Sequence, residues 1–243
     1  MLKENLQKLQ EKISLTCKKI GRNPEEIVLV AVTKNVPVER IKEAISLGIR
    51  DIGENRIQEA TQKIQSLITH NSSLITGVKW HMVGHLQTNK VKYAVKIFDL
   101  IHSVDDFELA QEIDKQAKKI NKIQDCLIEV KVSPEEEPSP LVSGKYGCPP
   151  GEVEELIIQI NQLTNIRLCG LMAMAPFFEN PEETRPYFRQ AFEIFQEVRL
   201  TCNLKPETFG LLSMGMSNDF VIALEEEANM LRIGTAIFGD NRI

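Results

Sequence analysis

The sequence has no long apolar segment. Its N-terminal residues, MLKENLQKLQEK, are polar and mixed in charge, so they lack the apolar core that a secretory signal peptide needs. Elsewhere no uninterrupted apolar run approaches the roughly 18 residues that a membrane-spanning helix requires. We therefore expect a cytoplasmic protein that does not associate with membranes.

Paired cysteines and metal-binding motifs are also missing. The five cysteines are odd in number and widely spaced, without a C-x-x-C pair, and the four histidines include no H-E-x-x-H motif. These patterns predict free thiols in place of disulfides, and they predict no metal site.

The sequence has no excess of positive charge. It contains 29 lysines and arginines against 34 aspartates and glutamates, which gives a net charge of -5. Because binding to a nucleic-acid backbone depends on clustered lysine and arginine, nucleic acid is not the expected partner. The 42% hydrophobic and 26% charged content is instead typical of a globular protein with a full core.

Short apolar runs and amphipathic segments alternate along the chain. The first run, IVLVAVT, is typical of a parallel strand that is buried on both faces, and a helix-like segment follows it. Strands are expected at 27–33, 49–55, 78–84, 98–104, 126–132, 166–175, 209–215 and 230–239. Eight strand–helix units predict an α/β fold with a single (β/α)8 TIM barrel over residues 1–243, in preference to an open doubly wound sheet. Apolar side chains at helical spacing over residues 2–20 predict an extra N-terminal helix, within residues 1–20, that packs on this barrel.

The expected barrel would gather several reactive groups at one mouth, because the C-terminal ends of its strands meet there. Lys34 follows the first strand, where burial would favour a neutral amine that can attack an aldehyde. Barrel enzymes frequently hold a phosphate after strands seven and eight, where Ser217 offers a hydroxyl and Gly234 permits close approach of the backbone. Taken singly, these residues also fit a solvated lysine and an ordinary helix cap. Together they predict a site for a phosphorylated aldehyde.

Several sequence blocks resemble the YggS/PROSC family of proteins that bind pyridoxal 5′-phosphate (PLP). In chain order they are AVTK (31–34), GENR (53–56), WHMVGHLQTNK (80–90), GLMAMAP (170–176), SMGMSND (213–219) and RIGTAIFG (232–239). That family is similar to the N-terminal barrel of the fold-type III PLP enzymes, such as alanine racemase. The resemblance therefore implies a barrel of this type with PLP as its cofactor.

The resemblance also implies roles for individual residues. Lys34 would bind PLP as a Schiff base, and Ser217 with the backbone of Gly234 and Thr235 would hold the phosphate. Arg232 would face the pyridine nitrogen and keep it unprotonated.

Further residues are implied around the ring. Asn55 and His85 would lie near the ring or its 3-oxygen, with a packed strand-end histidine as the alternative for His85. Met174 and Met214 would form a wall of the pocket. Lys145 in the SGKYG segment is a candidate second amine for handing the cofactor over, with a solvated lysine as the alternative.

The expected function is that of a carrier. Racemases and decarboxylases of this fold type carry a β-domain after the barrel, and the sequence ends at Ile243 without one. Because racemisation needs proton-transfer groups on both faces of the cofactor, we expect no catalytic activity. We expect a monomer that buffers PLP, or delivers it by transient contact to PLP-requiring apo-enzymes, in vitamin B6 homeostasis, with effects on amino-acid metabolism. The alternatives are a PLP-dependent racemase of the alanine racemase type, a Schiff-base aldolase acting on a sugar phosphate, and a platform for a protein partner.

Overall fold

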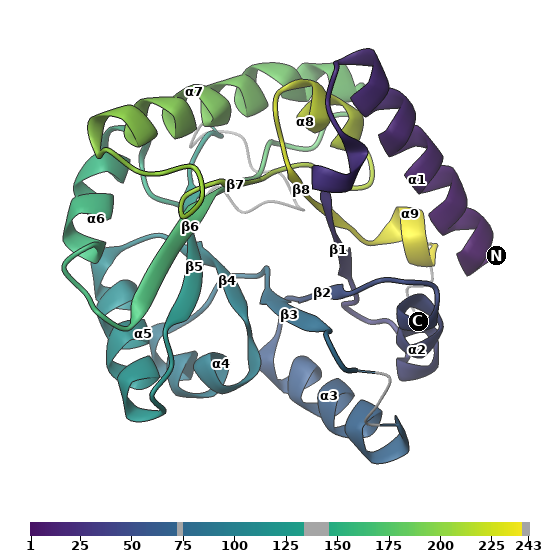
Figure 1. Ribbon diagram of the computed structural model, residues 1–243, viewed down its shortest axis with the longest axis horizontal. Helices are drawn as coiled ribbons and strands as arrows, with labels where there is room; N and C mark the ends of the chain where they lie inside the picture. The colour runs from purple at the N-terminus through teal and green to yellow at the C-terminus, as the bar shows by residue number, and fades with distance from the viewer. Residues whose placement is uncertain (72–74, 134–145, 240–243) are drawn as a thin grey trace.

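The computed structural model describes residues 1–71, 75–133 and 146–239. In this part of the chain, eight parallel strands pair in sequence order and close into a barrel (Figure 1). The strands are β1 (Val28–Val32), β2 (Asp51–Glu54), β3 (Lys79–Met82), β4 (Leu100–Val104), β5 (Gln124–Val130), β6 (Ile166–Ala173), β7 (Leu211–Ser213) and β8 (Met230–Ile233). The predicted (β/α)8 barrel is therefore confirmed.

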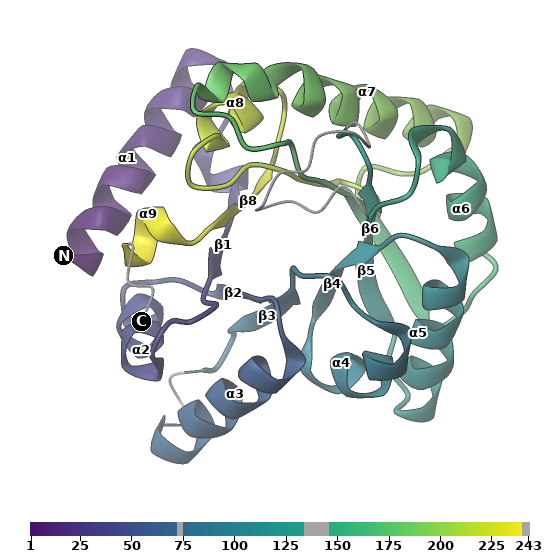
Figure 2. The same ribbon diagram turned by 180° about the vertical axis from the view of Figure 1, so that it is seen from behind.

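Helices surround the barrel on the outside, as Figures 1 and 2 show from opposite sides. The α-helices are α1 (Leu2–Lys19), α2 (Val38–Ser46), α3 (Ile57–Asn71), α4 (Val91–Ile97), α5 (Phe107–Lys119), α6 (Val153–Ile160), α7 (Arg185–Thr201), α8 (Phe220–Glu225) and α9 (Thr235–Phe238). Short 3-10 turns are η1 (Pro24–Glu26), η2 (Thr88–Lys90), η3 (Pro150–Glu152) and η4 (Pro181–Thr184). Within the described ranges, no helix combines the length and apolarity needed to cross a bilayer.

The strands separate two apolar cores, because successive side chains of a strand point to opposite faces. The larger core lies between the strands and the helices and includes Ala31, Ile52 and Leu231. A smaller cluster fills the barrel interior and includes Val30 and Met230. Burial on both faces explains why β1 appears in the sequence as a continuous apolar run.

The predicted N-terminal helix is present and packs on the last helices of the chain. The α1 side chains of Leu2, Leu6 and Leu9 are buried, and α1 contacts α8 and α9. Asn5 Nδ2 donates a hydrogen bond to the carbonyl oxygen of Ile237 in α9, at 3.1 Å. The start of the chain thereby supports the segment that follows β8.

Pairing of the first and last strands closes the barrel. Val28 to Ala31 of β1 lie in register with Met230 to Ile233 of β8. Nearby, Arg22 Nη1 donates to the carbonyl oxygen of Ala228 at 2.9 Å, across 206 positions of the chain. The closed ring therefore joins segments that are far apart in sequence.

The predicted end of the last strand is wrong. The strand expected at 230–239 ends at Ile233, because Ile237 and Phe238 bury their side chains from the short helix α9. In the loop after β7, α8 begins at Phe220, so Ser217 lies in the preceding turn.

Candidate functional site

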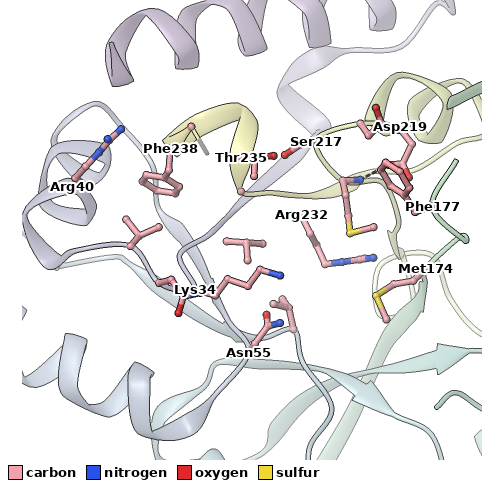
Figure 3. Close-up of a pocket in the computed structure, with 18 of the residues that line it drawn as sticks. Lys34, Arg40, Asn55, Met174, Phe177, Ser217, Asp219, Arg232, Thr235 and Phe238 are labelled. Carbon is pink, nitrogen blue, oxygen red and sulfur yellow. Dashed lines mark hydrogen bonds between the residues drawn. The ribbon is translucent and has the colours of Figure 1, made fainter. Parts of the chain in front are cut away.

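One pocket opens at the C-terminal ends of the strands, with a cavity volume of about 390 Å³ (Figure 3). This is the end of the barrel at which TIM-barrel active sites lie, and the volume is sufficient for a small cofactor. Seven of the residues singled out in the sequence line it: Lys34, Asn55, Met174, Ser217, Arg232, Gly234 and Thr235. The structure therefore brings together residues from the first, second, sixth, seventh and eighth strands or the loops that follow them.

Lys34 lies directly after β1, and its side chain is exposed to the pocket, not buried in its wall as expected. In Figure 3 it extends toward the guanidinium of Arg232. The chain turns sharply after Lys34, because Asn35 has a φ of 59°. Glu59 Oε1 accepts a hydrogen bond from the Asn35 backbone N–H at 2.7 Å and so stabilises this turn.

A buried ionic cluster holds the backbone next to Lys34. Lys63 Nζ in α3 donates to Glu54 Oε1 at 2.7 Å, to Glu59 Oε1 at 2.5 Å and to the Thr33 carbonyl oxygen at 2.5 Å. Glu54 also accepts a hydrogen bond from the Thr33 hydroxyl. Burial raises the pKa of Glu54, whereas the hydrogen bonds from Lys63 and Thr33 lower it. The cluster fixes the backbone on both sides of Lys34, and sequence analysis did not identify it.

Ser217 lies at the wall of the pocket opposite Lys34. Its Oγ accepts a hydrogen bond from the Ala236 backbone N–H at 3.1 Å, which leaves the hydroxyl hydrogen free to donate. Asp219 Oδ1 accepts from the Met216 N–H at 2.6 Å and stabilises the turn that carries Ser217. This wall therefore offers a hydroxyl donor to an anion.

Gly234 and Thr235 continue the same wall. A Cβ added to Gly234 would lie 3.4 Å from the carbonyl oxygen of Val32, an ordinary van der Waals contact. Packing within the protein therefore does not require glycine at this position, and the space beside its backbone opens to the pocket.

Arg232 is a buried cation at the base of the pocket, with 4% of its surface exposed. Its Nη1 donates to Ser213 Oγ at 2.6 Å, and its Nη2 donates to the Ala173 carbonyl oxygen at 2.9 Å. Burial lowers the pKa of Arg232 to about 10, and the negative charges of Glu129 and Asp219 oppose this shift. At neutral pH the pocket therefore contains a fixed positive charge.

Asn55 follows β2 and is held against Gly84, which follows β3. A Cβ at position 84 would lie 2.7 Å from the Asn55 carbonyl oxygen and 2.9 Å from its Cα. Only glycine permits this close approach. Gly84 is thus a further residue that shapes the pocket. It lies in the WHMVGHLQTNK block (80–90), but the sequence alone gave it no role.

Two predicted residues do not line the pocket. The ring of His85 stacks on Tyr146, with centroids 3.7 Å apart, and its Nδ1 lies 4.0 Å from Asp105 Oδ2. Met214 is fully buried in the core outside the barrel. It follows Ser213, which points into the interior, so strand alternation turns Met214 away from it. Met174, expected beside it, does line the pocket, as does Met216.

Lys145 lies outside the described residues. Among the described side chains, no group of three or more histidine, cysteine, aspartate or glutamate residues could hold a metal ion.

Comparison with known proteins places the chain in a family. Residues 3–242 match the family model of the alanine racemase N-terminal domain. The chain is 41% identical over 239 residues to the pyridoxal phosphate homeostasis protein of Aquifex aeolicus, covering 98% of both chains. The chain belongs to the pyridoxal phosphate homeostasis protein family. This result confirms the family that the sequence blocks predicted.

Other members of the pyridoxal phosphate homeostasis protein family support the assignment. The Escherichia coli K12 protein of that name is 36% identical, covering 97% of this chain and 94% of that one. A solved structure of PipY from Synechococcus elongatus, with PLP bound, has a TM-score of 0.81 and 33% identity, covering 98% of this chain and all of that one. Alanine racemase from Clostridium difficile shares the fold, with a TM-score of 0.70 at 17% identity, and the match covers 60% of that enzyme.

Proposed function

We propose that this protein binds PLP covalently through Lys34 and acts in PLP homeostasis as a noncatalytic carrier. The observation that carries the proposal is the shared pocket, in which an accessible lysine amine lies opposite the Ser217–Thr235 wall. Among the described residues, Lys34 makes no hydrogen bond or ion pair, so its amine is free to react. The name of the relatives and the PLP bound to PipY support the same conclusion.

The donors in the pocket fit the chemical groups of PLP. The free hydroxyl hydrogen of Ser217 suits a phosphate oxygen, and the open backbone at Gly234 and Thr235 lets that phosphate approach closely. The buried Arg232 cation suits an unprotonated pyridine nitrogen, because a guanidinium only donates hydrogen bonds. Asn55 offers an amide to the ring substituents.

Bound PLP supplies an aldehyde that reacts reversibly with amines. Lys34 provides the amine for this covalent link, and its exposure leaves the link accessible to water or to an incoming amine. Such access suits release of the cofactor. Closure of the site against water, which catalysis of decarboxylation needs, is not required for a carrier.

The composition of the pocket supports the noncatalytic part of the proposal. Among the described lining residues, Lys34 alone has an amine, and none has an imidazole, a phenol or a thiol. The one carboxyl group among them, of Asp219, accepts a hydrogen bond from the Met216 N–H. Racemisation needs a second proton-transfer group on the other face of the cofactor.

We extend the proposal to a cytoplasmic monomer that contacts PLP-requiring apo-enzymes transiently, as expected from the sequence.

The test combines a visible absorption spectrum with borohydride reduction and peptide mapping. Wild-type protein should take up PLP, show a visible band and carry a reduced pyridoxyl group on the Lys34 peptide. Lys34→Ala should lose the band, whereas Lys92→Ala, a change on the outer helix α4, should retain it. Failure of the wild type to take up PLP, or an adduct on another lysine, would contradict the proposal.

The same purified protein also tests two alternative functions, a racemase and a Schiff-base aldolase. Sustained interconversion of L- and D-alanine, followed by chiral chromatography, would make the protein a racemase and reject the noncatalytic role. A sugar phosphate trapped on Lys34 by borohydride, with no uptake of PLP, would indicate an aldolase.

A further inference from the structure

A buried chain of hydrogen bonds leads away from Arg232 through the barrel interior. Arg232 Nη1 donates to Ser213 Oγ in β7, and Ser213 Oγ lies 3.2 Å from His102 Nδ1 in β4. His102 Nε2 lies 3.0 Å from His81 Nδ1 in β3, and His81 Nε2 lies 2.9 Å from Asp51 Oδ1 in β2. We call Ser213, His102, His81 and Asp51 the transbarrel chain.

The transbarrel chain connects the two rims of the barrel. Asp51 is the first residue of β2, so it lies at the N-terminal rim, and 22% of its side chain is exposed. Ser213 and His102 are completely buried, and His81 is 2% exposed. Only the Asp51 end of the chain therefore reaches solvent, and the other end reaches the pocket through Arg232.

Both ends of the transbarrel chain impose the same direction on its hydrogen bonds. A guanidinium can only donate, so Ser213 Oγ accepts from Arg232 and its own hydrogen is free for His102 Nδ1. An ionised carboxylate can only accept, so His81 donates to Asp51 from Nε2. Burial, His81 and Arg232 lower the pKa of His102, which is therefore neutral with one N–H. That hydrogen lies on Nε2 and is donated to His81 Nδ1.

We propose that the transbarrel chain is a positioning relay, which orients Arg232 in the pocket and couples this orientation to Asp51 at the opposite rim. In this arrangement every group donates toward Asp51. Ser213 then presents a lone pair to Arg232, because its hydrogen points toward His102.

Other charged groups act on this arrangement from neighbouring elements. Arg232 also interacts with Glu129 of β5 and with Asp219 before α8. His102 interacts with His81 and Arg232. The remaining interior surface is apolar and includes Val30 and Leu127. The transbarrel chain is therefore the hydrogen-bonded connection, within the described residues, that links Arg232 to Asp51.

Histidine tautomers test the relay without any ligand. Long-range 1H–15N NMR of the full chain, labelled with 15N-histidine, distinguishes a hydrogen on Nδ1 from one on Nε2. We expect both His81 and His102 to carry their hydrogen on Nε2. A His102 that carries Nδ1–H, or a His81 without a hydrogen on Nε2, would overturn the proposal.

Coupling to the pocket is tested by PLP affinity, and this arm rests on the proposed function. Ser213→Ala should weaken PLP binding about tenfold, as expected for loss of one buried hydrogen bond to a charged group. Asp51→Asn, far from the pocket, should weaken it about threefold. The matched control is Asp125→Asn, because Asp125 lies at the same rim but pairs with Arg167; it should leave affinity unchanged.

A double variant decides whether Asp51 acts through Ser213. If it does, Asp51→Asn has no further effect in the Ser213→Ala background, because the connection is already broken. Independent effects that multiply, or an Asp51→Asn variant that binds PLP as the wild type does, would refute the coupling. Wild-type protein that takes up no PLP would reject the proposed function, and the NMR result would still decide the relay.

Discussion

Replacement of Lys63 by methionine should destabilise the protein strongly and in a manner that depends on pH. Lys63 is the cation that pairs with the fully buried Glu54, and it also binds Glu59 and the Thr33 carbonyl oxygen. Methionine retains most of the volume of the side chain but removes its charge and donors. Within the part of the chain that the structure describes, Glu54 Oε2 already has no hydrogen-bond partner, so the variant leaves this carboxylate poorly compensated.

The magnitude follows from the cost of an unpaired buried charge. Removing one partner of a buried ion pair costs about 3–5 kcal/mol of the free energy of unfolding. Protonation of Glu54 limits this cost, because the acid is neutral. Loss of Lys63 removes a cause that lowers the pKa of Glu54, so this pKa rises further above its unfolded value.

The sign of the pH dependence follows from that shift. A carboxyl group whose folded pKa exceeds its unfolded pKa destabilises the protein above the folded pKa. This destabilisation disappears as the pH falls through the folded pKa toward the unfolded value of about 4.3. The stability of Lys63→Met relative to wild type should therefore recover on acidification.

Urea denaturation at about pH 8 and at about pH 5.5 measures this difference, and the loss should be at least about 1 kcal/mol smaller at the lower pH. The control is Lys115→Met, which removes an exposed pair with Glu112 and should cost less than about 0.5 kcal/mol at either pH. A loss below about 1 kcal/mol for Lys63→Met, or an equal loss at both pH values, would refute the reasoning.

Three further predictions concern single residues. Gly234→Ala should leave the free energy of unfolding unchanged or raise it by up to about 1 kcal/mol, since the added methyl group makes only an ordinary contact with Val32. Its PLP affinity should fall about tenfold, because the methyl group occupies space beside the backbone in the pocket. A variant that is thermally less stable than the wild type would contradict this prediction. Burial raises the pKa of Glu129 to about 7, so its charge destabilises the folded state as the pH rises through 7. Glu129→Gln should therefore raise stability at about pH 8 by up to about 3 kcal/mol and flatten the urea-measured pH profile; a less stable variant at that pH would reject the explanation. Among the described residues, Arg40 Nε and Nη2 are buried without a hydrogen-bond partner, so Arg40→Met should raise the free energy of unfolding in urea by about 1 kcal/mol, whereas a destabilised variant would indicate that Arg40 has a partner.

The order of strands and helices was predictable because short segments rich in apolar residues, of which β1 is an apolar, β-branched example, alternate with amphipathic segments along the chain. The end of β8 was not predictable in the same way. The segment TAIF is apolar and short, so its composition fits a strand and a helix equally well. Its packing against α1, including the bond from Asn5 to Ile237, selects the helix, and that contact is distant in sequence.

Pocket residues were predictable where the fold alone fixes their position. Lys34 and Asn55 follow strands whose C-terminal ends meet at one rim, so the topology brings them together. His85 lies in a loop, and its direction depends on stacking with Tyr146, which no local pattern indicates. Met214 was misplaced because strand alternation turns it away from the barrel interior, which the preceding residue, Ser213, faces.

The transbarrel chain shows a different limit of sequence analysis. Asp51, His81 and His102 each alternate with apolar residues in their strands, so an inward direction can be inferred for each. Their mutual hydrogen bonds depend on the stagger between strands, which the sequence does not specify. Lys63 was missed for a similar reason, because a lysine on a helix usually points to solvent.

Closure of the ring between β1 and β8 has a consequence for biosynthesis. Lys34 after β1 and Thr235 after β8 both line the pocket, so the pocket is incomplete in a nascent chain that has not yet made its last strand. Cofactor uptake should therefore follow completion of synthesis and barrel assembly. Because the ligand binds the closed ring and not an open intermediate, PLP should also slow unzipping of the β1–β8 seam and protect the newly made protein from proteolysis.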